Sequence, residues 1–385
     1  MKTWLLGFLP LWGSKKKQYE SLRSFLDEKE LRYVKVLLHQ QHINVAFSTF
    51  GTTIVPDEQF PQIFALSKAK DLQYRLERWN KTIKQQVRKR HIHAFSEHAF
   101  ERIVGLIAPH IEGFDMIKKA VALQLVSTER FHILLLGDPG TGKTDIVRSA
   151  LALHEHSAFG LGSGTSGVGL TASVQGKEVT EGLLPKAHLG VCGIDELNLM
   201  QAKDMGSLYN AMEKGFVTYT KGRHDIRFEA QVRILATANP KGDKFVGKSI
   251  AILKEQIPFD SALLTRFHLV FLLRAPNAQQ FASISKKIIS HKHVHIQEAD
   301  IAFIQDYVAY AETIDVSIPK HLEQQMVDFI TELKKQEHTY MVEISARTVH
   351  GLMRLAQASA RMHLRKQISE DDLAQAQQIM RFALQ

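Results

Sequence analysis

A glycine-rich segment carries the residues best suited to chemistry. It reads Gly137-Asp138-Pro139-Gly140-Thr141-Gly142-Lys143-Thr144 and fits the pattern G-x-x-x-x-G-K-[ST] directly after an apolar run at 131–136. Glycines let backbone N–H groups turn toward phosphates, and a following helix adds the positive end of its dipole. Lys143 is expected to reach the β- and γ-phosphates of a nucleotide, and the Thr144 hydroxyl is expected to bind Mg²⁺.

A pair of adjacent carboxylates ends a second apolar run. Residues 191–194 lead into Asp195 and Glu196, about fifty residues after the glycine-rich loop. Asp195 at a strand end is expected to hold the magnesium shell, and Glu196 is expected to orient and deprotonate an attacking water. An Asp-Glu pair is commonly just an exposed helix start, but its position after a buried strand favours catalysis.

Three further residues acquire a role only through these two motifs. Asn239 ends a third apolar run and is expected to hydrogen-bond the γ-phosphate or the water. Arg266 offers the planar, permanently charged group that suits a transition-state phosphate, and Arg347 lies in the predicted helical domain, to which it could report the nucleotide state. Taken singly, the Asn-Pro step is a turn signal and each arginine is an ordinary surface residue.

Alternating elements must position these residues. Short apolar runs typical of strands buried on both faces occur at 131–136, 189–194, 231–237 and 269–273, with helical patterns between them. The pattern predicts an α/β fold, with a P-loop core whose parallel sheet is flanked by helices, then an all-α lid and a small mixed N-terminal part. The expected domains are 1–98, 99–275 and 276–385. A capping box at 369–372 is expected to start the last helix.

The first hundred residues contain two smaller features. Residues 33–38 and 43–50 could pair as strands. Residues 67–90 read as an amphipathic helix with a basic face, which binds nucleic acid or lipid in some proteins and is simply a solvated helix in others.

Together these features resemble the AAA+ ATPases and, within them, the minichromosome maintenance (MCM) replicative helicases. The second resemblance rests on the segments 107–111, 117–125, 169–172, 181–184, 208–213, 264–271 and 344–362. It implies ATP and Mg²⁺ as cofactors, a ring that is a homo-hexamer or another closed assembly, and a DNA helicase or translocase. It also implies that Arg266 completes the neighbouring subunit's site and that Arg347 is the second sensor.

A candidate hairpin carries the expected DNA contacts. Residues 216–220 and 226–230 are β-like runs joined by a short basic segment with a glycine. The resemblance places this hairpin in the ring's pore, with Lys221 and Arg223 on the phosphate backbone of single- or double-stranded DNA. An exposed hairpin with an incidental lysine is the plainer interpretation.

The sequence departs from the family pattern in several places. Gly142 and Thr144 replace the usual alanine and serine, and Asn198 and His268 stand where acidic residues are common. We expect a truncated form without the N-terminal barrel, the winged helix or a zinc site. Two alternatives therefore stay open: a protein-remodelling or chelatase-like (MoxR-like) ATPase, and a regulatory MCM relative that does not translocate DNA.

Composition sets the remaining bounds. The 385 residues carry a net charge of +9, which favours an anionic partner. The single cysteine, Cys192, excludes a disulfide within the chain and suits a cytoplasmic location. The apolar start at 4–12 is too short to span a bilayer, so no stable membrane insertion is expected.

Overall fold

The protein is represented by a computed structural model that describes residues 43–48, 51–56, 92–175, 178–221, 224–247, 249–276, 282, 285 and 298–384. The chain divides into two compact units, Met1–Phe95 and Ser96–Gln385. In the first unit, β1 (Ile43–Ser48) pairs antiparallel with β2 (Gly51–Pro56). The strand expected at 43–50 thus pairs with the segment that follows it, while 33–38 and the helix expected at 67–90 lie outside the described residues.

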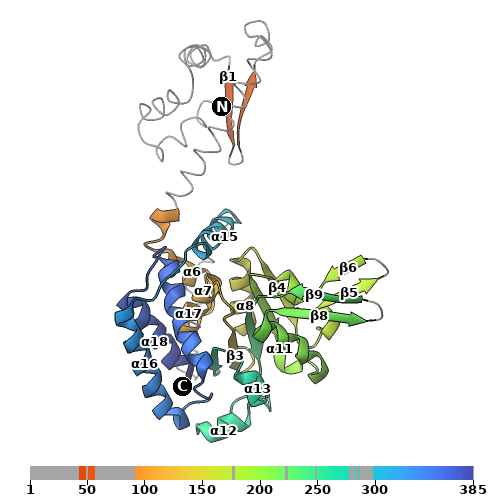
Figure 1. Ribbon diagram of the computed structural model, residues 1–385, viewed down its shortest axis with the longest axis vertical. Coiled ribbons are helices and arrows are strands. Elements are labelled where there is room, and N and C mark those ends of the chain that lie inside the picture. The colour runs from red at the N-terminus through yellow and green to blue at the C-terminus, as the bar shows by residue number, and fades with distance from the viewer. Residues whose placement is uncertain are drawn as a thin grey trace. The chain divides into compact units, whose positions relative to one another are not determined.

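A five-stranded parallel sheet forms the centre of the second unit (Figure 1). Its order is β11 (Leu269–Leu273), β3 (Ile133–Gly137), β10 (Arg233–Ala238), β7 (Val191–Asp195) and β4 (Ser157–Leu161). Every residue of β3, β7 and β10 is buried, as expected for strands covered on both faces. The predicted α/β core is confirmed.

Helices cover the sheet and fill the connections. They are α6 (Ala99–Leu106), α7 (Asp115–Leu125), α8 (Lys143–Ala152), α9 (Gly167–Leu170), α10 (Leu183–Lys186), η1 (Leu197–Leu199), η2 (Ala202–Asp204), α11 (Met205–Lys214), α12 (Ile250–Glu255) and α13 (Ser261–Leu264). Helix α8 packs against β4, β7 and β10. Alternate strand residues such as Leu134 and Ile234 form an apolar cluster with Leu208 and Met212 of α11. This packing fixes the strand ends that carry the polar residues.

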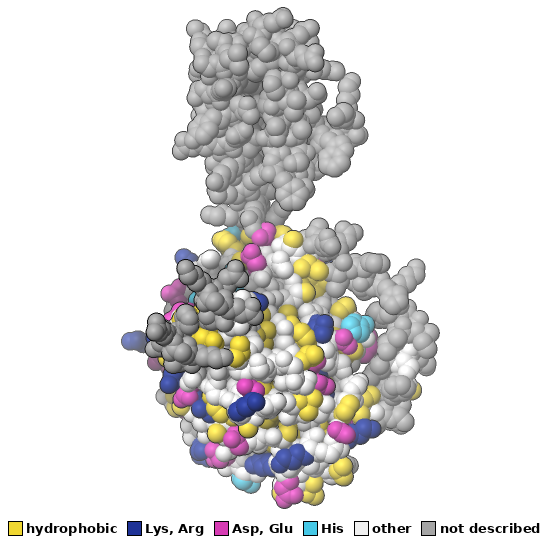
Figure 2. All heavy atoms as spheres, turned by 90° about the vertical axis from the view of Figure 1, so that its right-hand side faces the viewer, with side chains coloured by type: hydrophobic (Ala, Val, Ile, Leu, Met, Phe, Trp, Pro, Cys, Tyr) yellow, Lys and Arg dark blue, Asp and Glu magenta, His cyan; other side chains and the backbone are white. Residues whose placement is uncertain are grey.

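Two antiparallel hairpins extend from the second unit on one side, at the right of Figure 1. They are β5 (Ala172–Gln175) with β6 (Glu178–Glu181), and β8 (Phe216–Lys221) with β9 (His224–Glu229). Strand β8 directly follows α11, and Lys221 is paired with His224 across the turn. The hairpin expected between 216 and 230 is therefore present, with a tighter turn than the sequence indicated. On the side shown in Figure 2, the described basic and acidic side chains are intermixed.

The chain after β11 is helical where it is described. It forms α15 (Glu298–Glu312), α16 (Lys320–Lys335), η3 (Glu337–Thr339), α17 (Ala346–Met362) and α18 (Glu370–Leu384). The capping box before α18 is confirmed, because the Asp372 N–H donates to Ser369 Oγ at 3.3 Å while the Ser369 N–H donates to Asp372 Oδ2 at 2.8 Å. Helix α17 packs on α7, and α18 packs on α7 and β11. No helix in the described ranges is long and apolar enough to cross a membrane.

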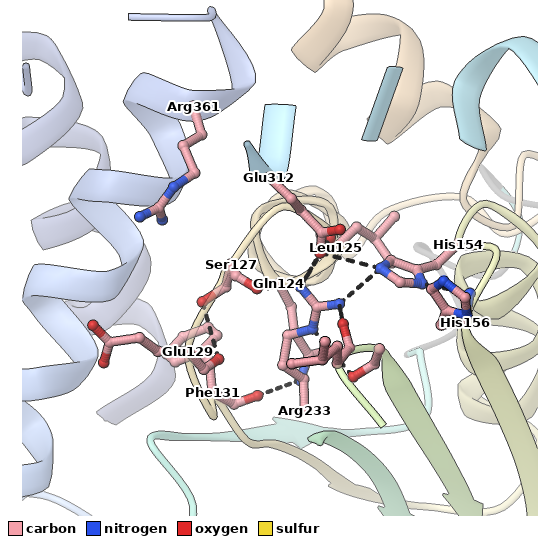
Figure 3. A network of polar contacts seen from close by, with 12 residues as sticks. Gln124, Leu125, Ser127, Glu129, Phe131, His154, His156, Arg233, Glu312 and Arg361 are labelled. Atoms are coloured by element: carbon pink, nitrogen blue, oxygen red, sulfur yellow. Dashed lines mark hydrogen bonds and ion pairs between the residues drawn. The ribbon is translucent and has the colours of Figure 1, made fainter. Parts of the chain in front are cut away.

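A buried arginine ties this helical region to the sheet (Figure 3). Arg233 starts β10 and is 3% exposed, and its guanidinium pairs with the carboxylate of Glu312 at the end of α15. It also donates to the carbonyls of Leu125, Ser127, Leu189 and Gly190 and contacts His154 Nε2 at 2.7 Å. Burial opposes ionisation of Glu312, but the hydrogen bond with His154 and the charge of Arg233 outweigh it and lower the pKa of this carboxyl.

Candidate nucleotide site

The glycine-rich loop connects β3 to α8, as expected of a phosphate-binding loop. Gly142 lies at the N-cap of α8 with φ +79°, a left-handed conformation that glycine adopts without steric cost. Lys143 and Thr144 are therefore the first two residues of the helix. Their backbone N–H groups have no partner within the helix, and such groups suit an anion.

The side chain of Lys143 folds back into the loop. Its ammonium donates to the carbonyls of Gly137 at 2.8 Å and Asp138 at 2.7 Å. Burial lowers the pKa of Lys143 to about 8, and the charges of Asp138, Asp195 and Glu196 only partly oppose this. The lysine is thus a buried cation whose hydrogen-bond partners are uncharged oxygens.

The Asp195 carboxylate links strands β7 and β10 to helix α8. Thr144 Oγ1 lies 3.1 Å and 2.9 Å from its two oxygens, and the Thr237 hydroxyl donates to its Oδ1. These residues meet because parallel strands place their carboxyl ends at one edge of the sheet. Hydroxyl and carboxylate oxygens are the ligands that Mg²⁺ prefers.

This oxygen set is a partial one. Within the described residues, no three His, Cys, Asp or Glu side chains gather in a way that could hold a metal ion. Mg²⁺ usually keeps several waters and takes one or two protein oxygens plus substrate phosphates. The Thr144–Asp195 pair fits that requirement.

Glu196 and Asn239 follow the ends of adjacent strands β7 and β10. Glu196 has φ +52°, and its N–H donates to Thr237 Oγ1 at 2.9 Å. The Asn239 N–H donates to the side-chain oxygen of Asn198 at 3.0 Å. The structure therefore brings Lys143, Asp195, Glu196 and Asn239 to the same edge of the sheet.

Asp138 and Thr141 stabilise the conformation of the loop through hydrogen bonds. The Asp138 carboxylate is 5% exposed and accepts the N–H groups of Phe245 at 2.8 Å and Ala275 at 2.9 Å. Thr141 Oγ1 donates to the Asp138 carbonyl at 2.8 Å. The Asp138 side chain thus holds the loop to two later segments of the chain.

Arg266 lies at the opposite side of the sheet, where the amino ends of the parallel strands meet. It precedes β11, whose first residue, Leu269, is paired with Ile133 at the start of β3, whereas the phosphate loop follows Gly137 at the other end. The start of β3 at Ile133 and its end at Gly137 are four residues apart, which corresponds to about 13 Å along the strand. The guanidinium lies over the Tyr209 ring at 4.5 Å and pairs with Glu213 at 3.1 Å. Arg266 is therefore not next to the phosphate loop of its own chain.

Arg347 lies near Arg266, on the side of the sheet where the amino ends of the strands meet. It is the second residue of α17, which the Ser345 capping box begins. Burial and the nearby charge of Arg266 lower the pKa of Arg347. The two arginines, predicted from separate parts of the sequence, are thus close enough to repel each other.

The two expected DNA-contacting residues are placed only in part. Lys221 is the last residue of β8, at the end of the hairpin, and its side chain lies outside the described atoms. Arg223 falls outside the described residues.

Sequence reasoning missed Thr237 and Arg233. Thr237 is 1% exposed within an apolar strand, where a threonine is an ordinary β-former. A signal was available in its position, two residues before Asn239 and therefore on the same strand face as that residue. Arg233 interrupts an apolar run, and a charge in a buried strand indicates a partner.

Comparison with known proteins agrees with this geometry. The family described as the MCM P-loop domain matches residues 88–292, more than half of the chain, and the MCM AAA-lid domain matches residues 302–384. The chain belongs to the MCM family. The ordered pair of matches also agrees with a sheet-based core followed by a helical lid.

Curated relatives carry the same family name. The chain is 29% identical over 310 residues to "DNA replication licensing factor mcm7-B" of Xenopus laevis, covering 74% of this chain and 43% of the relative. It is 27% identical over 311 residues to "Minichromosome maintenance protein MCM" of Saccharolobus solfataricus, covering 74% and 45%. The chain of this MCM family member thus spans less than half the length of these relatives.

Proposed function

We propose that this MCM family protein hydrolyses ATP at the carboxyl edge of its sheet. The observation that carries the proposal is the hydrogen-bonded arrangement of Thr144, Asp195 and Thr237 beside a buried lysine. Lys143 binds the β- and γ-phosphates, and Thr144 and Asp195 hold Mg²⁺ and its waters. The bound ion neutralises charge that develops on the phosphates. Glu196 orients the water and accepts its proton, and Asn239 holds that water or the γ-phosphate.

We further propose that Arg266 and Arg347 act on the site of a neighbouring copy. About 13 Å of strand separates the end of the sheet near Arg266 from the phosphate loop of the same chain, and the two arginines lie close together with one carboxylate, that of Glu213, paired to Arg266. A triphosphate presented by the next subunit supplies further negative charge to this pair of arginines. A ring such as a homo-hexamer gives every copy one complete site of this kind.

Mixed rings test the contribution from the neighbour. Arg266→Ala subunits keep an intact phosphate loop, and Lys143→Ala subunits keep an intact arginine. Each variant alone is expected to lose ATPase activity, by about 10³-fold for the arginine. A mixture is expected to regain part of the rate, because some interfaces then combine an intact loop with an intact arginine. A mixture whose ATPase rate is no more than the sum of the rates of the two variants contradicts the proposal.

The proposed substrate is DNA. The β8–β9 hairpin ends at Lys221, and a lysine at the tip of an exposed hairpin suits a sequence-independent contact to phosphate. In this proposal the core (99–275) and lid (276–385) form the motor, Lys221 and Arg223 contact the DNA backbone, and residues 1–98 are a separate unit. ATP turnover then drives translocation or strand separation in replication or repair.

The deciding experiment measures ATP hydrolysis with and without single-stranded DNA. Glu196→Gln serves as the inactive control and Lys221→Ala as the DNA-contact variant. A Glu196-dependent rate that DNA raises, together with a salt-sensitive affinity that Lys221→Ala weakens, supports the translocase. A Glu196-dependent rate that ignores DNA contradicts the DNA part alone and favours a protein substrate. Equal rates for wild type and Glu196→Gln contradict the ATPase itself.

A further inference from the structure

Thr237 occupies the gap between the two acidic residues of the site. Its hydroxyl donates to Asp195 Oδ1 and accepts the N–H of Glu196 at 2.9 Å. A hydroxyl has one proton to donate and two lone pairs, so both contacts are satisfied at once. At 1% exposure, the side chain is buried.

The backbone at Glu196 needs such support. Its φ of +52° is a left-handed conformation that a residue with a long side chain rarely adopts, and it persists only when the surroundings hold it. On the other side, the Gly162 N–H donates to the Asp195 carbonyl at 2.7 Å. A Cβ atom at Gly162 would lie 2.2 Å from the Glu196 carbonyl oxygen, so that position accepts only glycine. The Asp195–Glu196 step is thus held from both neighbouring strands.

We propose that Thr237 is a positioning residue for the hydrolysis step, which fixes the Asp195 carboxylate and the Glu196 backbone relative to each other through its single hydroxyl. The inference rests on the proposed ATPase function. Strand β10 would then have two roles. It leads into Asn239, which holds the water, and through Thr237 it positions Glu196, which activates the water.

The division of labour between the two threonines follows from their locations. Thr144 lies on the loop helix, and its hydroxyl could ligate Mg²⁺ through a lone pair while its proton stays hydrogen-bonded to Asp195. Thr237 lies on a buried strand, and its hydroxyl is engaged by both the Asp195 carboxylate and the Glu196 N–H. Thr237 therefore adds a hydrogen bond to Asp195 that comes from the sheet rather than from the phosphate loop.

The test compares Thr237→Val with Thr237→Ser in the full chain. Valine keeps the volume and removes the hydroxyl, and serine keeps the hydroxyl and removes a methyl group. Three quantities are measured: kcat and KM for ATP, the Mg²⁺ concentration for half-maximal rate, and the Mg²⁺ dependence of binding of a fluorescent ATP analogue. Melting temperatures show that each variant is folded.

We expect Thr237→Val to lower kcat by 10- to 100-fold, to leave KM within about threefold, and to shift the Mg²⁺ requirement of hydrolysis and binding upward. Thr237→Ser is expected to remain within about threefold of wild type in all three. A valine variant with wild-type kcat and Mg²⁺ requirement overturns the proposal. Equal losses in both variants also overturn it, because they identify a packing role.

Failure of the ATPase proposal gives a different result. In that case wild type and Glu196→Gln show the same background rate, and kcat carries no information about Thr237. The binding measurement still decides: the valine variant requires more Mg²⁺ for nucleotide binding if Thr237 positions Asp195, and the same Mg²⁺ as wild type if it does not.

Discussion

At the carboxyl end of the sheet, Lys143 is a buried cation hydrogen-bonded to carbonyl oxygens, whereas at the amino end Arg233 is a buried cation paired with the carboxylate of Glu312. Both side chains are less than a tenth exposed. Burial lowers the pKa of each, but only Arg233 has an opposite charge within hydrogen-bond distance. A buried charge that is fully paired within the chain serves the fold, and one that lacks its counter-charge is suited to a charged ligand.

The largest expected effect comes from breaking the buried ion pair between Arg233 and Glu312. Glu312→Gln leaves the Arg233 charge buried without an anion and is expected to lower the free energy of unfolding by about 3–5 kcal/mol. The exposed pair Arg381–Glu332, at 2.9 Å in the same helical region, is the matched control, and Glu332→Gln is expected to change the melting temperature far less. Calorimetric melting temperatures measure both.

A double replacement sharpens this prediction. Arg233→Met with Glu312→Met removes both charges and is expected to recover most of the stability, because apolar side chains need no counter-charge. Equal melting temperatures for Glu312→Gln and Glu332→Gln would show that the buried pair contributes no more than the exposed one.

Replacing Lys143, the buried cation without a bonded carboxylate, is expected to have the opposite effect on stability. Lys143→Met removes a buried cation without a bonded anion, so the ligand-free protein is expected to melt at the same or a higher temperature. Nucleotide binding and ATP turnover are expected to fall by on the order of 100-fold or more, because a charged donor to the phosphates is lost. Melting curves and equilibrium binding of an ATP analogue test both parts. A lower melting temperature in Lys143→Met would mean that the lysine serves the fold as well.

The pKa of Lys143 predicts how ATP affinity depends on pH. In the free protein this pKa is about 8, and a bound triphosphate raises it by stabilising the ammonium. Binding above pH 8 therefore takes up a proton, and the affinity is expected to fall up to tenfold between pH 8 and 9, with little change between pH 6 and 7. Calorimetric titration in buffers of different ionisation enthalpy measures that uptake.

The same shift affects stability with a defined sign. Because the folded pKa is below the unfolded value of about 10.5, the protonated lysine destabilises the folded state below pH 8, and this penalty is relieved as the pH rises from about 8 toward 10.5. The stability advantage of Lys143→Met over wild type is expected to shrink across that range. An advantage that stays constant from pH 7 to 10 would contradict the burial of a charged lysine.

The smallest expected effect concerns the strained backbone beside the site. Glu196→Gly relieves the left-handed conformation but adds flexibility to the unfolded chain, so the net gain in stability is expected to be at most about 1 kcal/mol. Glu196→Gln keeps the backbone restriction and is expected to leave stability unchanged, and both variants are expected to lose hydrolysis. A melting temperature for Glu196→Gly clearly below that of Glu196→Gln would show that the conformation is not strained.

Much of the fold could be predicted from periodicity and composition. Four of the five strands were located within two residues at each end, because β3, β7, β10 and β11 are continuous apolar runs. Strand β4 was missed because Ser157–Leu161 contains small residues and a glycine and lies at the edge of the sheet, where less burial is required. The turn of the β8–β9 hairpin is tighter than expected because strand pairing continues to Lys221 and His224.

The sequence by itself predicted the residues of the candidate nucleotide site, because Asp195, Glu196 and Asn239 stand at strand ends, Lys143 and Thr144 begin the helix after β3, and parallel strands bring these positions to one edge. Only the tertiary structure decided which residues are used elsewhere. It assigned Arg233 to a closed ion pair, grouped Arg266 with Arg347 at the far edge, and placed the Thr237 hydroxyl between two carboxylate-bearing residues. These assignments depend on contacts between residues far apart in the chain, and local patterns of residue type do not say which distant residue is the partner.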